Sequence, residues 1–277
     1  MIQHFVCNGA RLRFFDTGSG LPVLFLHPTP LSHAYWLPVI TRLKNRRAIA
    51  LDLRGHGGSE LEGSLPEQAL PVGGFVPGVA ELTLGRLAED VLAMLDYLKI
   101  EKADFVGCSI GGYLLLELWR RAPERMSRLA FVCSKAQGDT PEGREKRKLT
   151  IEKIQSDGVE ATLDGLVKSL TGATSQRENP TLTGELRAMA TLNLKSAQAV
   201  QAGLGLRPDS LATVETIQRP VLAIAGEEDA VCTAQEMEAF KKAPGGCEFH
   251  LLAKTGHFSA CEQPDAVAAI IQSWLER

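Results

Sequence analysis

Short, continuous runs of apolar residues recur along the chain, and stretches with helical periodicity separate them. Such runs are typical of strands buried on both faces, as in a parallel sheet. Two early runs, 2–7 and 12–15, flank the turn dipeptide Asn8-Gly9 and predict a hairpin. The later runs predict further strands at 23–26, 48–51, 103–106, 129–132, 221–225 and 249–252.

Helical patterns fill much of the space between these strands. Apolar residues in 84–98 follow the spacing of one helical face. Residues 110–122 predict a helix that Pro123 closes, and 266–274 predict the last helix. Strands that alternate with helices predict an α/β fold, with a mainly parallel, twisted sheet flanked by helices.

The alternation is interrupted between about residues 135 and 213, where no strand pattern is found. Helical patterns occur there at 142–155, 159–170, 182–192 and 196–204. A helical block between two sheet strands predicts a cap over the sheet. We therefore expect a core made of residues 1–134 and 214–277, with a helical cap at 135–213. The Gly- and Pro-bearing stretch 62–78 predicts a long loop.

Composition and charge exclude several classes of protein. The chain has 277 residues, 44% of them hydrophobic and 23% charged, which suffices for a sizeable globular core. The net charge is -3 and no basic stripe is present, so nucleic-acid binding is not expected. Neither a secretory signal nor a membrane-spanning apolar stretch is visible. The six cysteines form no Cys-x-x-Cys pair, which fits a reduced, cytoplasmic compartment without a zinc or redox motif.

The segment Gly107-Cys108-Ser109-Ile110-Gly111 fits the pattern G-x-S-x-G between a predicted strand and a predicted helix. In that context a sharp turn lifts the serine hydroxyl above the sheet edge. The pattern predicts that Ser109 is a nucleophile. The alternative is a glycine-rich helix start that only packs closely. A phosphate-binding loop is disfavoured because neither Gly-Lys-Ser nor Gly-Lys-Thr is present.

A serine nucleophile needs a base, and the base needs an acid to orient it. Among the six histidines, His257 follows the nucleophile and lies after the last predicted strand, whereas His250 falls inside that strand. The strand before it ends in three carboxylates, Glu227, Glu228 and Asp229. Each of them could simply be solvated. Asp229 is favoured because the third position after the glycine clears the strand end.

An oxyanion needs two hydrogen-bond donors. The backbone N–H of Ile110, directly after the nucleophile, is one candidate. The other is expected on the loop after 23–26, which reads His27-Pro28-Thr29-Pro30. Proline has no N–H, so Thr29 is the one backbone donor between the two prolines, and its hydroxyl is a further candidate.

These pieces, in this order, resemble the α/β-hydrolase superfamily, most closely its group of carboxylesterases and 3-oxoadipate enol-lactonase-like proteins. The resemblance covers nearly the whole chain except the helical insert, and segments 52–59 (DLRGHGGS) and 256–258 (GHF) also carry it. Relatives usually have glycine where Pro28 stands. In some relatives the acid follows the earlier strand, here 129–132, but residues 133–135 include no carboxylate.

The resemblance implies an enzyme that cleaves a small-molecule ester or lactone with Ser109, His257 and Asp229, without a cofactor or metal. Thr29 and Ile110 would hold the oxyanion. The same residues would also suit a carbon–carbon bond hydrolase or a cofactor-free perhydrolase. A ligand receptor on a hydrolase scaffold is the non-enzyme alternative, disfavoured because all three residues are present. The sequence sets neither substrate size nor oligomeric state, and a homo-oligomer is compatible with it.

Overall fold

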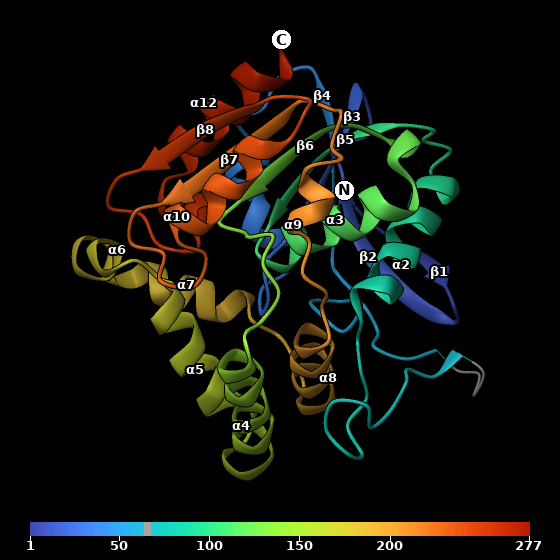
Figure 1. Cartoon of the computed structure of the whole chain (residues 1–277), viewed down its shortest axis with the longest axis vertical. Helices are drawn as coiled ribbons and strands as arrows, with labels where there is room; N and C mark the ends of the chain where they lie inside the picture. Colours follow the sequence, from blue (N-terminus) through green and yellow to red (C-terminus); the bar gives the residue numbers. More distant parts are fainter. Residues whose placement is uncertain (64–67) are drawn as a thin grey trace.

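The centre of the structure, a computed structural model that describes residues 1–63 and 68–277, is an eight-stranded sheet (Figure 1). The strands lie in the order β1-β2-β4-β3-β5-β6-β7-β8. Their bounds are β1 Ile2–Cys7, β2 Ala10–Asp16, β3 Leu21–Leu26, β4 Arg46–Leu51, β5 Ala103–Cys108, β6 Met126–Val132, β7 Val221–Gly226 and β8 Cys247–Leu252.

The sheet is mainly parallel, as the continuous apolar runs predict. β1 and β2 form the expected antiparallel hairpin, with Asn8 at φ 47° and Gly9 at φ 72° in its turn. β2 pairs antiparallel with β4, and the pairs from β4 through to β8 are parallel. The mainly parallel α/β sheet flanked by helices is therefore confirmed.

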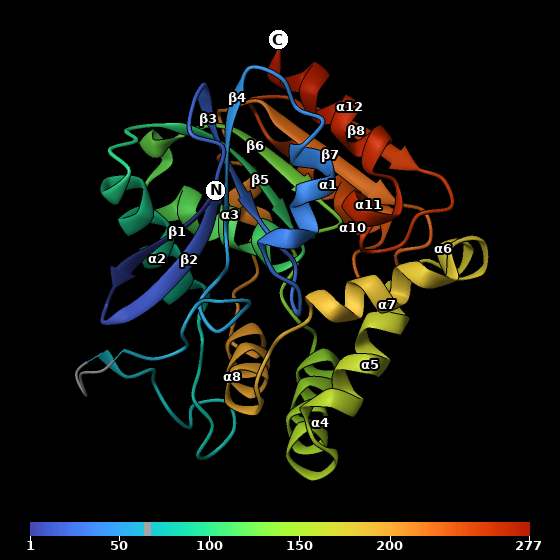
Figure 2. The ribbon, with the colours of Figure 1, turned by 180° about the vertical axis from the view of Figure 1, so that it is seen from behind.

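Helices cover both faces of the sheet, which is why its central strands are apolar throughout. Along β3, Leu24 and Leu26 belong to one core cluster, while Val23 and Phe25 belong to the other. The helices on the first face are α2 Leu84–Tyr97, α3 Ile110–Arg121, α9 Leu211–Val214 and α10 Ala234–Met237. Those on the second, seen in Figure 2, are α1 Leu37–Ile40, α11 Ser259–Glu262 and α12 Pro264–Leu275. Short 3-10 helices add η1 His33–Trp36, η3 Pro123–Arg125 and η4 Glu238–Lys242.

The predicted helical insert forms a layer beyond one end of the sheet (Figures 1 and 2). Its helices are α4 Pro141–Asp157, α5 Val159–Leu170, α6 Ala173–Glu178, α7 Pro180–Met189 and α8 Leu194–Gly205. Every residue between β6 and β7 is described, and none of them is in a strand. The sequence did not predict α6, because its six residues, ATSQRE, are too few and too polar to show a helical face. The division into core and cap at residues 134 and 213 stays a prediction.

Two further expectations bear on the surroundings of the site. Residues 64–67, within the stretch predicted as a long loop, lie outside the described residues, while Val72 and Ala80 form an isolated bridge at its end. In the described ranges, none of the helices combines the length and the apolar character needed to cross a membrane. The six cysteines are free thiols.

Candidate active site

Ser109 occupies a sharp turn between β5 and α3. Its φ of 52° and ψ of -117° are unusual for a residue with a side chain. Two glycines allow the turn to pack: a Cβ on Gly107 would lie 2.5 Å from the Gly111 backbone, and one on Gly111 would lie 2.2 Å from the Leu26 oxygen. The turn is therefore pressed against the carboxyl end of β3, as the G-x-S-x-G pattern requires.

Hydrogen bonds hold the backbone of this turn in place. The Ser109 N–H donates to the Val132 and Cys133 carbonyls, both at 3.2 Å. The Ser109 carbonyl accepts the Ser134 hydroxyl at 2.9 Å. Ile110 is the first residue of α3, and N–H groups in the first turn of a helix have no partner within the helix. Its N–H is thus available beside the serine.

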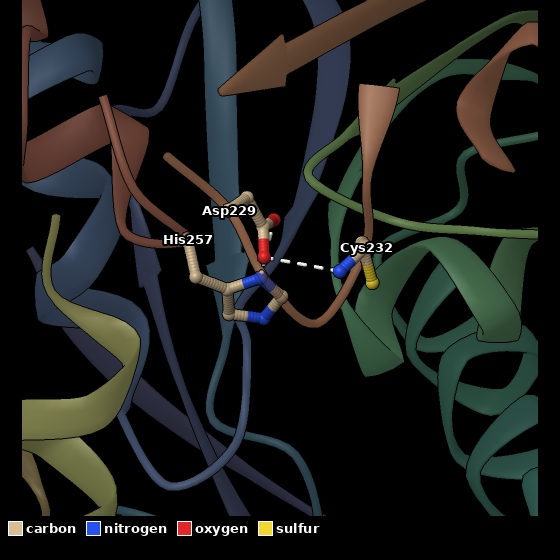
Figure 3. A group of neighbouring side chains, drawn as sticks. All are labelled: Asp229, Cys232 and His257. Carbon is tan, nitrogen blue, oxygen red and sulfur yellow. Dashed lines mark hydrogen bonds and ion pairs between the residues drawn. The ribbon is translucent and has the colours of Figure 1, made fainter. Parts of the chain in front are cut away.

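Asp229 and His257 form a buried pair at the ends of β7 and β8. The Asp229 Oδ2 lies 2.7 Å from His257 Nδ1, and the two side chains are 0% and 2% exposed. The other carboxylate oxygen accepts the N–H groups of Val231 at 2.8 Å and Cys232 at 3.0 Å (Figure 3). Burial would raise the pKa of the Asp229 carboxyl, but His257 and these hydrogen bonds hold it below the usual value. An ionised Asp229 fixes His257 with its proton on Nδ1 and leaves Nε2 free to accept one.

The other two carboxylates of the strand end point elsewhere. Glu227 accepts the backbone N–H of Lys254 at 2.9 Å. Glu228 accepts the N–H of Thr174, on α6, at 2.8 Å. The structure therefore brings Asp229, and neither of its two predecessors, to His257.

The loop that carries His257 lies against the turn that carries Ser109. The Cys108 thiol faces the His257 carbonyl at 3.8 Å, and the Cys133 thiol faces the Gly256 carbonyl at 3.6 Å. Within the described residues no hydrogen bond joins the Ser109 hydroxyl to His257. Catalytic hydrogen bonds are often long without substrate and shorten when it binds. The sequence pattern gave no signal for these supporting thiols, because cysteine is also an ordinary core residue.

The Asp229–His257 pair lies close to the Cys232 thiol, and the three side chains together resemble a set of metal ligands. Ligand atoms of Asp229, Cys232 and His257 all lie within 4.8 Å of one another. However, the Cys232 sulfur contacts the Tyr113 hydroxyl at 3.4 Å, and burial raises the pKa of this thiol to about 12. Metal ligands must be deprotonated, and here His257 Nδ1 is already committed to Asp229. The donor set favours an acid–base pair over a metal centre.

Thr29 lies half-buried on the loop after β3, and its hydroxyl faces His56. The Oγ1–Nε2 distance is 3.1 Å, while His56 Nδ1 lies 3.0 Å from the Arg54 carbonyl. A carbonyl can only accept, so Nδ1 carries the ring proton and Nε2 must accept the proton of the Thr29 hydroxyl. Burial lowers the pKa of His56 to about 4, which keeps the ring neutral near pH 7. The hydroxyl is therefore not a free donor, and the backbone N–H remains the candidate on Thr29.

Several known proteins resemble this chain in sequence and fold. Residues 23–270 match the alpha/beta hydrolase family. The chain is 25% identical to 3-oxoadipate enol-lactonase 1 of Acinetobacter baylyi, over 92% of this chain and 88% of the relative. It is also 25% identical to a 2-hydroxymuconate semialdehyde hydrolase of Pseudomonas putida, over 99% and 93%. A solved thermophilic esterase from Thermogutta terrifontis gives a TM-score of 0.85 at 29% identity, covering 96% of this chain and 93% of that one. These comparisons confirm the fold that the sequence resemblance implies.

Proposed function

Because the chain is an enzyme of the alpha/beta hydrolase family, we propose that it hydrolyses a small-molecule carboxylic ester or lactone through a covalent intermediate on Ser109. The observation that carries this proposal is the buried Asp229–His257 pair, with its 2.7 Å contact. It lies beside a turn that holds Ser109 in a conformation few side-chain-bearing residues adopt. Buried acid–base pairs beside a presented serine are the arrangement that nucleophilic catalysis needs.

In the acylation step the Ser109 oxygen bonds to the carbonyl carbon while its proton passes to His257 Nε2. The carbonyl oxygen becomes an oxyanion, which the N–H groups of Ile110 and Thr29 stabilise. The tetrahedral intermediate collapses when the bond to the leaving oxygen breaks, and His257 returns the proton to that oxygen. Asp229 stays ionised and stabilises the imidazolium while it exists. The product is an acyl-enzyme and an alcohol, which in a lactone stays attached to the acyl group.

In the deacylation step water takes the place of the serine hydroxyl. His257 accepts a proton from the water, whose oxygen attacks the acyl carbon and gives a second oxyanion in the same position. Breakage of the bond to Ser109 then releases the acid, and the serine regains its proton from His257. His257 accepts and returns every proton that is transferred in the cycle, so the proposal needs neither a cofactor nor a metal.

Two relatives support ester or lactone cleavage, and one supports a second candidate. The thermophilic esterase and the enol-lactonase point to ester-type carbonyls. The 2-hydroxymuconate semialdehyde hydrolase favours the carbon–carbon bond alternative, with the same serine and base. Helices α4–α8 are proposed as the cap that selects among substrates. The cytoplasmic location and the homo-oligomer stay predictions.

A substrate panel separates the two candidates. The panel contains activated esters of graded acyl length, lactones of graded ring size and an activated β-diketone, with the Ser109→Ala variant as the matched blank. We expect ester or lactone turnover that disappears in the variant. Turnover of the diketone alone would favour the carbon–carbon bond hydrolase. Ester turnover equal in the variant and the wild type would contradict a serine mechanism.

A further inference from the structure

The turn between α5 and α6, which we call the cap corner (residues 170–175), contacts the loop that carries His257. We call that loop the base loop (residues 253–258). The His257 N–H donates to the carbonyl of Leu170 at 3.0 Å. The backbone of the proposed base is therefore bonded directly to the cap.

Two glycines make this contact unusually close. A Cβ on Gly172 would lie 2.7 Å from the Gly256 nitrogen, and a Cβ on Gly256 would lie 2.3 Å from the Gly172 nitrogen. Real side chains do not tolerate such distances to backbone atoms, so only glycine fits at both positions. The cap corner and the base loop thus meet backbone against backbone.

The carboxylate of Glu262, on α11, binds both segments at once. Its Oε2 accepts the N–H of Gly172 at 3.1 Å and the hydroxyl of Ser175 at 2.7 Å, both in the cap corner. The same oxygen accepts the Gly256 N–H at 2.9 Å, and Oε1 accepts the Phe258 N–H at 3.0 Å, both in the base loop. Charge-assisted hydrogen bonds of this kind are stronger than neutral ones.

Three consecutive N–H groups of the base loop are therefore held by groups tied to the cap. Glu262 binds those of Gly256 and Phe258, and Leu170 binds that of His257 between them. The backbone sets the direction of the His257 side chain, while Asp229 holds the ring at Nδ1. A catalytic group needs placement to within a fraction of an ångström, so these bonds bear on catalysis.

Glu228 offers an internal comparison. Its carboxylate accepts the Thr174 N–H at 2.8 Å and the Thr174 hydroxyl at 2.5 Å, so it binds the cap corner. Among the described residues, the Glu228 carboxylate accepts no hydrogen bond from the base loop. The backbone N–H of Glu228 also donates to the Thr255 carbonyl in the base loop at 2.8 Å, but a change of side chain leaves that bond in place. Of the two carboxylates, that of Glu262 binds both segments, whereas that of Glu228 binds the cap corner.

We propose that Glu262 is a positioning residue that sets the His257 ring by joining the base loop to the cap corner. The placement of the cap and the placement of the base are thereby coupled. This proposal rests on the proposed function, since it takes His257 as the base. Glutamine cannot replace Glu262, because an amide has one acceptor oxygen and its NH₂ would face a donor on the other side. At least one of the four donors is then left unpaired.

The test compares Glu262→Gln and Glu228→Gln with Glu178→Gln, an exposed residue of α6, as the neutral control. The rate at which a small fluorophosphonate labels Ser109 measures how well His257 activates the serine. KM and kcat are measured on the ester that is turned over fastest. We expect Glu262→Gln to slow labelling and to lower kcat by about 10- to 100-fold, the cost of a small misplacement. Glu228→Gln should change KM while the labelling rate stays within about threefold of the wild type.

Hydrogen exchange followed by mass spectrometry gives a readout that does not depend on activity. Glu262→Gln should lose protection in both 170–175 and 253–258, and Glu228→Gln in 170–175 alone. Gly172→Ala keeps the carboxylate but wedges the two segments apart, so it should also slow labelling if Glu262→Gln fails to fold. Equal labelling in Glu262→Gln and wild type, or equal effects of the two glutamate variants, would overturn the proposal. If the wild type is not labelled at Ser109, the proposed function fails, and protection lost in only one segment would then overturn the bridge as well.

Discussion

The hydroxyl of Thr29 donates its only proton to Nε2 of His56 across 3.1 Å, so this side chain has no proton left for an oxyanion. The direction follows from the other ring nitrogen, which donates to the Arg54 carbonyl. The hydroxyl thus anchors the loop, and the backbone N–H of the same residue is the proposed oxyanion donor. Substitution can separate anchoring of the loop from the proposed stabilisation of the oxyanion.

Thr29→Ser should behave like the wild type, because it keeps both the hydroxyl and the N–H. Thr29→Val keeps the N–H but leaves His56 Nε2 buried without a partner, which costs about 1–3 kcal/mol of stability. We expect a lower melting temperature for Thr29→Val, with kcat reduced by less than about tenfold. A loss of about 10²–10³ in kcat, the size expected for an oxyanion donor, would assign the hydroxyl to catalysis instead.

Asp229→Asn should lower kcat by about 10⁴, because an amide beside His257 Nδ1 favours the wrong ring tautomer. Glu227→Gln is the matched control, since the exposed Glu227 carboxylate accepts the N–H of Lys254 at the outer end of the base loop and makes no hydrogen bond to His257 among the described residues. Its kcat should stay within about threefold of the wild type. Steady-state kinetics on one activated ester measures both. A larger effect at Glu227 than at Asp229 would mean that the acid has been misassigned.

Acid should destabilise the protein as the pH falls from about 6.5 to about 4. Burial lowers the pKa of His56 to about 4 and that of His27 to about 3, so the folded state resists protons that the unfolded chain binds below its ordinary value of about 6.5. The contribution of these two histidines to stability is therefore full above about 6.5, and it is lost as the pH falls to about 4 for His56 and about 3 for His27. Urea unfolding at several pH values measures the slope.

The slope of the unfolding free energy against pH measures how many protons are taken up on unfolding. The variant His56→Gln should lower this number by about one, because one titrating group is removed. His4→Gln, on an exposed side chain of β1, should leave it unchanged. An unaltered slope in His56→Gln would show that His56 titrates normally in the folded state.

The cap helices should govern which substrates are accepted. Leu166, on α5, is partly buried. It packs against the core cluster that contains apolar residues of α11 and α12, the helices that follow the base loop. We expect Leu166→Ala to change the ratio of kcat/KM between short and long acyl esters by about tenfold. This is the size of effect expected when the fit of a substrate in an apolar pocket changes by about one methylene group. Leu149→Ala, at a 56% exposed position on α4, is the control. Identical ratios in wild type and Leu166→Ala would remove Leu166 from the specificity surface.

The sequence could predict the sheet because its central strands bury both faces, which leaves continuous apolar runs. It also predicts that Ser109, Asp229 and His257 follow strand ends, because a strand end followed by a turn presents a side chain at the sheet edge. The structure brings Asp229 to His257 and turns Glu227 and Glu228 away. The choice among the three depended on spacing alone until that geometry was known.

The connections between cap and core could not be predicted from the sequence. Glu262 lies in a short helix and binds Gly172, a residue 90 positions earlier, so no local periodicity reports the contact. Gly172 and Gly256 look like ordinary loop glycines until their backbones are seen to abut. The Thr29 hydroxyl likewise meets His56, 27 positions away. Contacts of this kind depend on how distant loops meet at one end of the sheet.

Covalent labelling of Ser109 tests the central claim most directly. The intact protein is treated with a fluorophosphonate, and the site of attachment is mapped by mass spectrometry of peptides, alongside Ser109→Ala and His257→Gln. The account predicts one label on Ser109, none in Ser109→Ala, and labelling slowed by at least about 10³ in His257→Gln, where the base is absent. A label on Cys108 or elsewhere that persists in Ser109→Ala, or labelling that does not depend on His257, would contradict it.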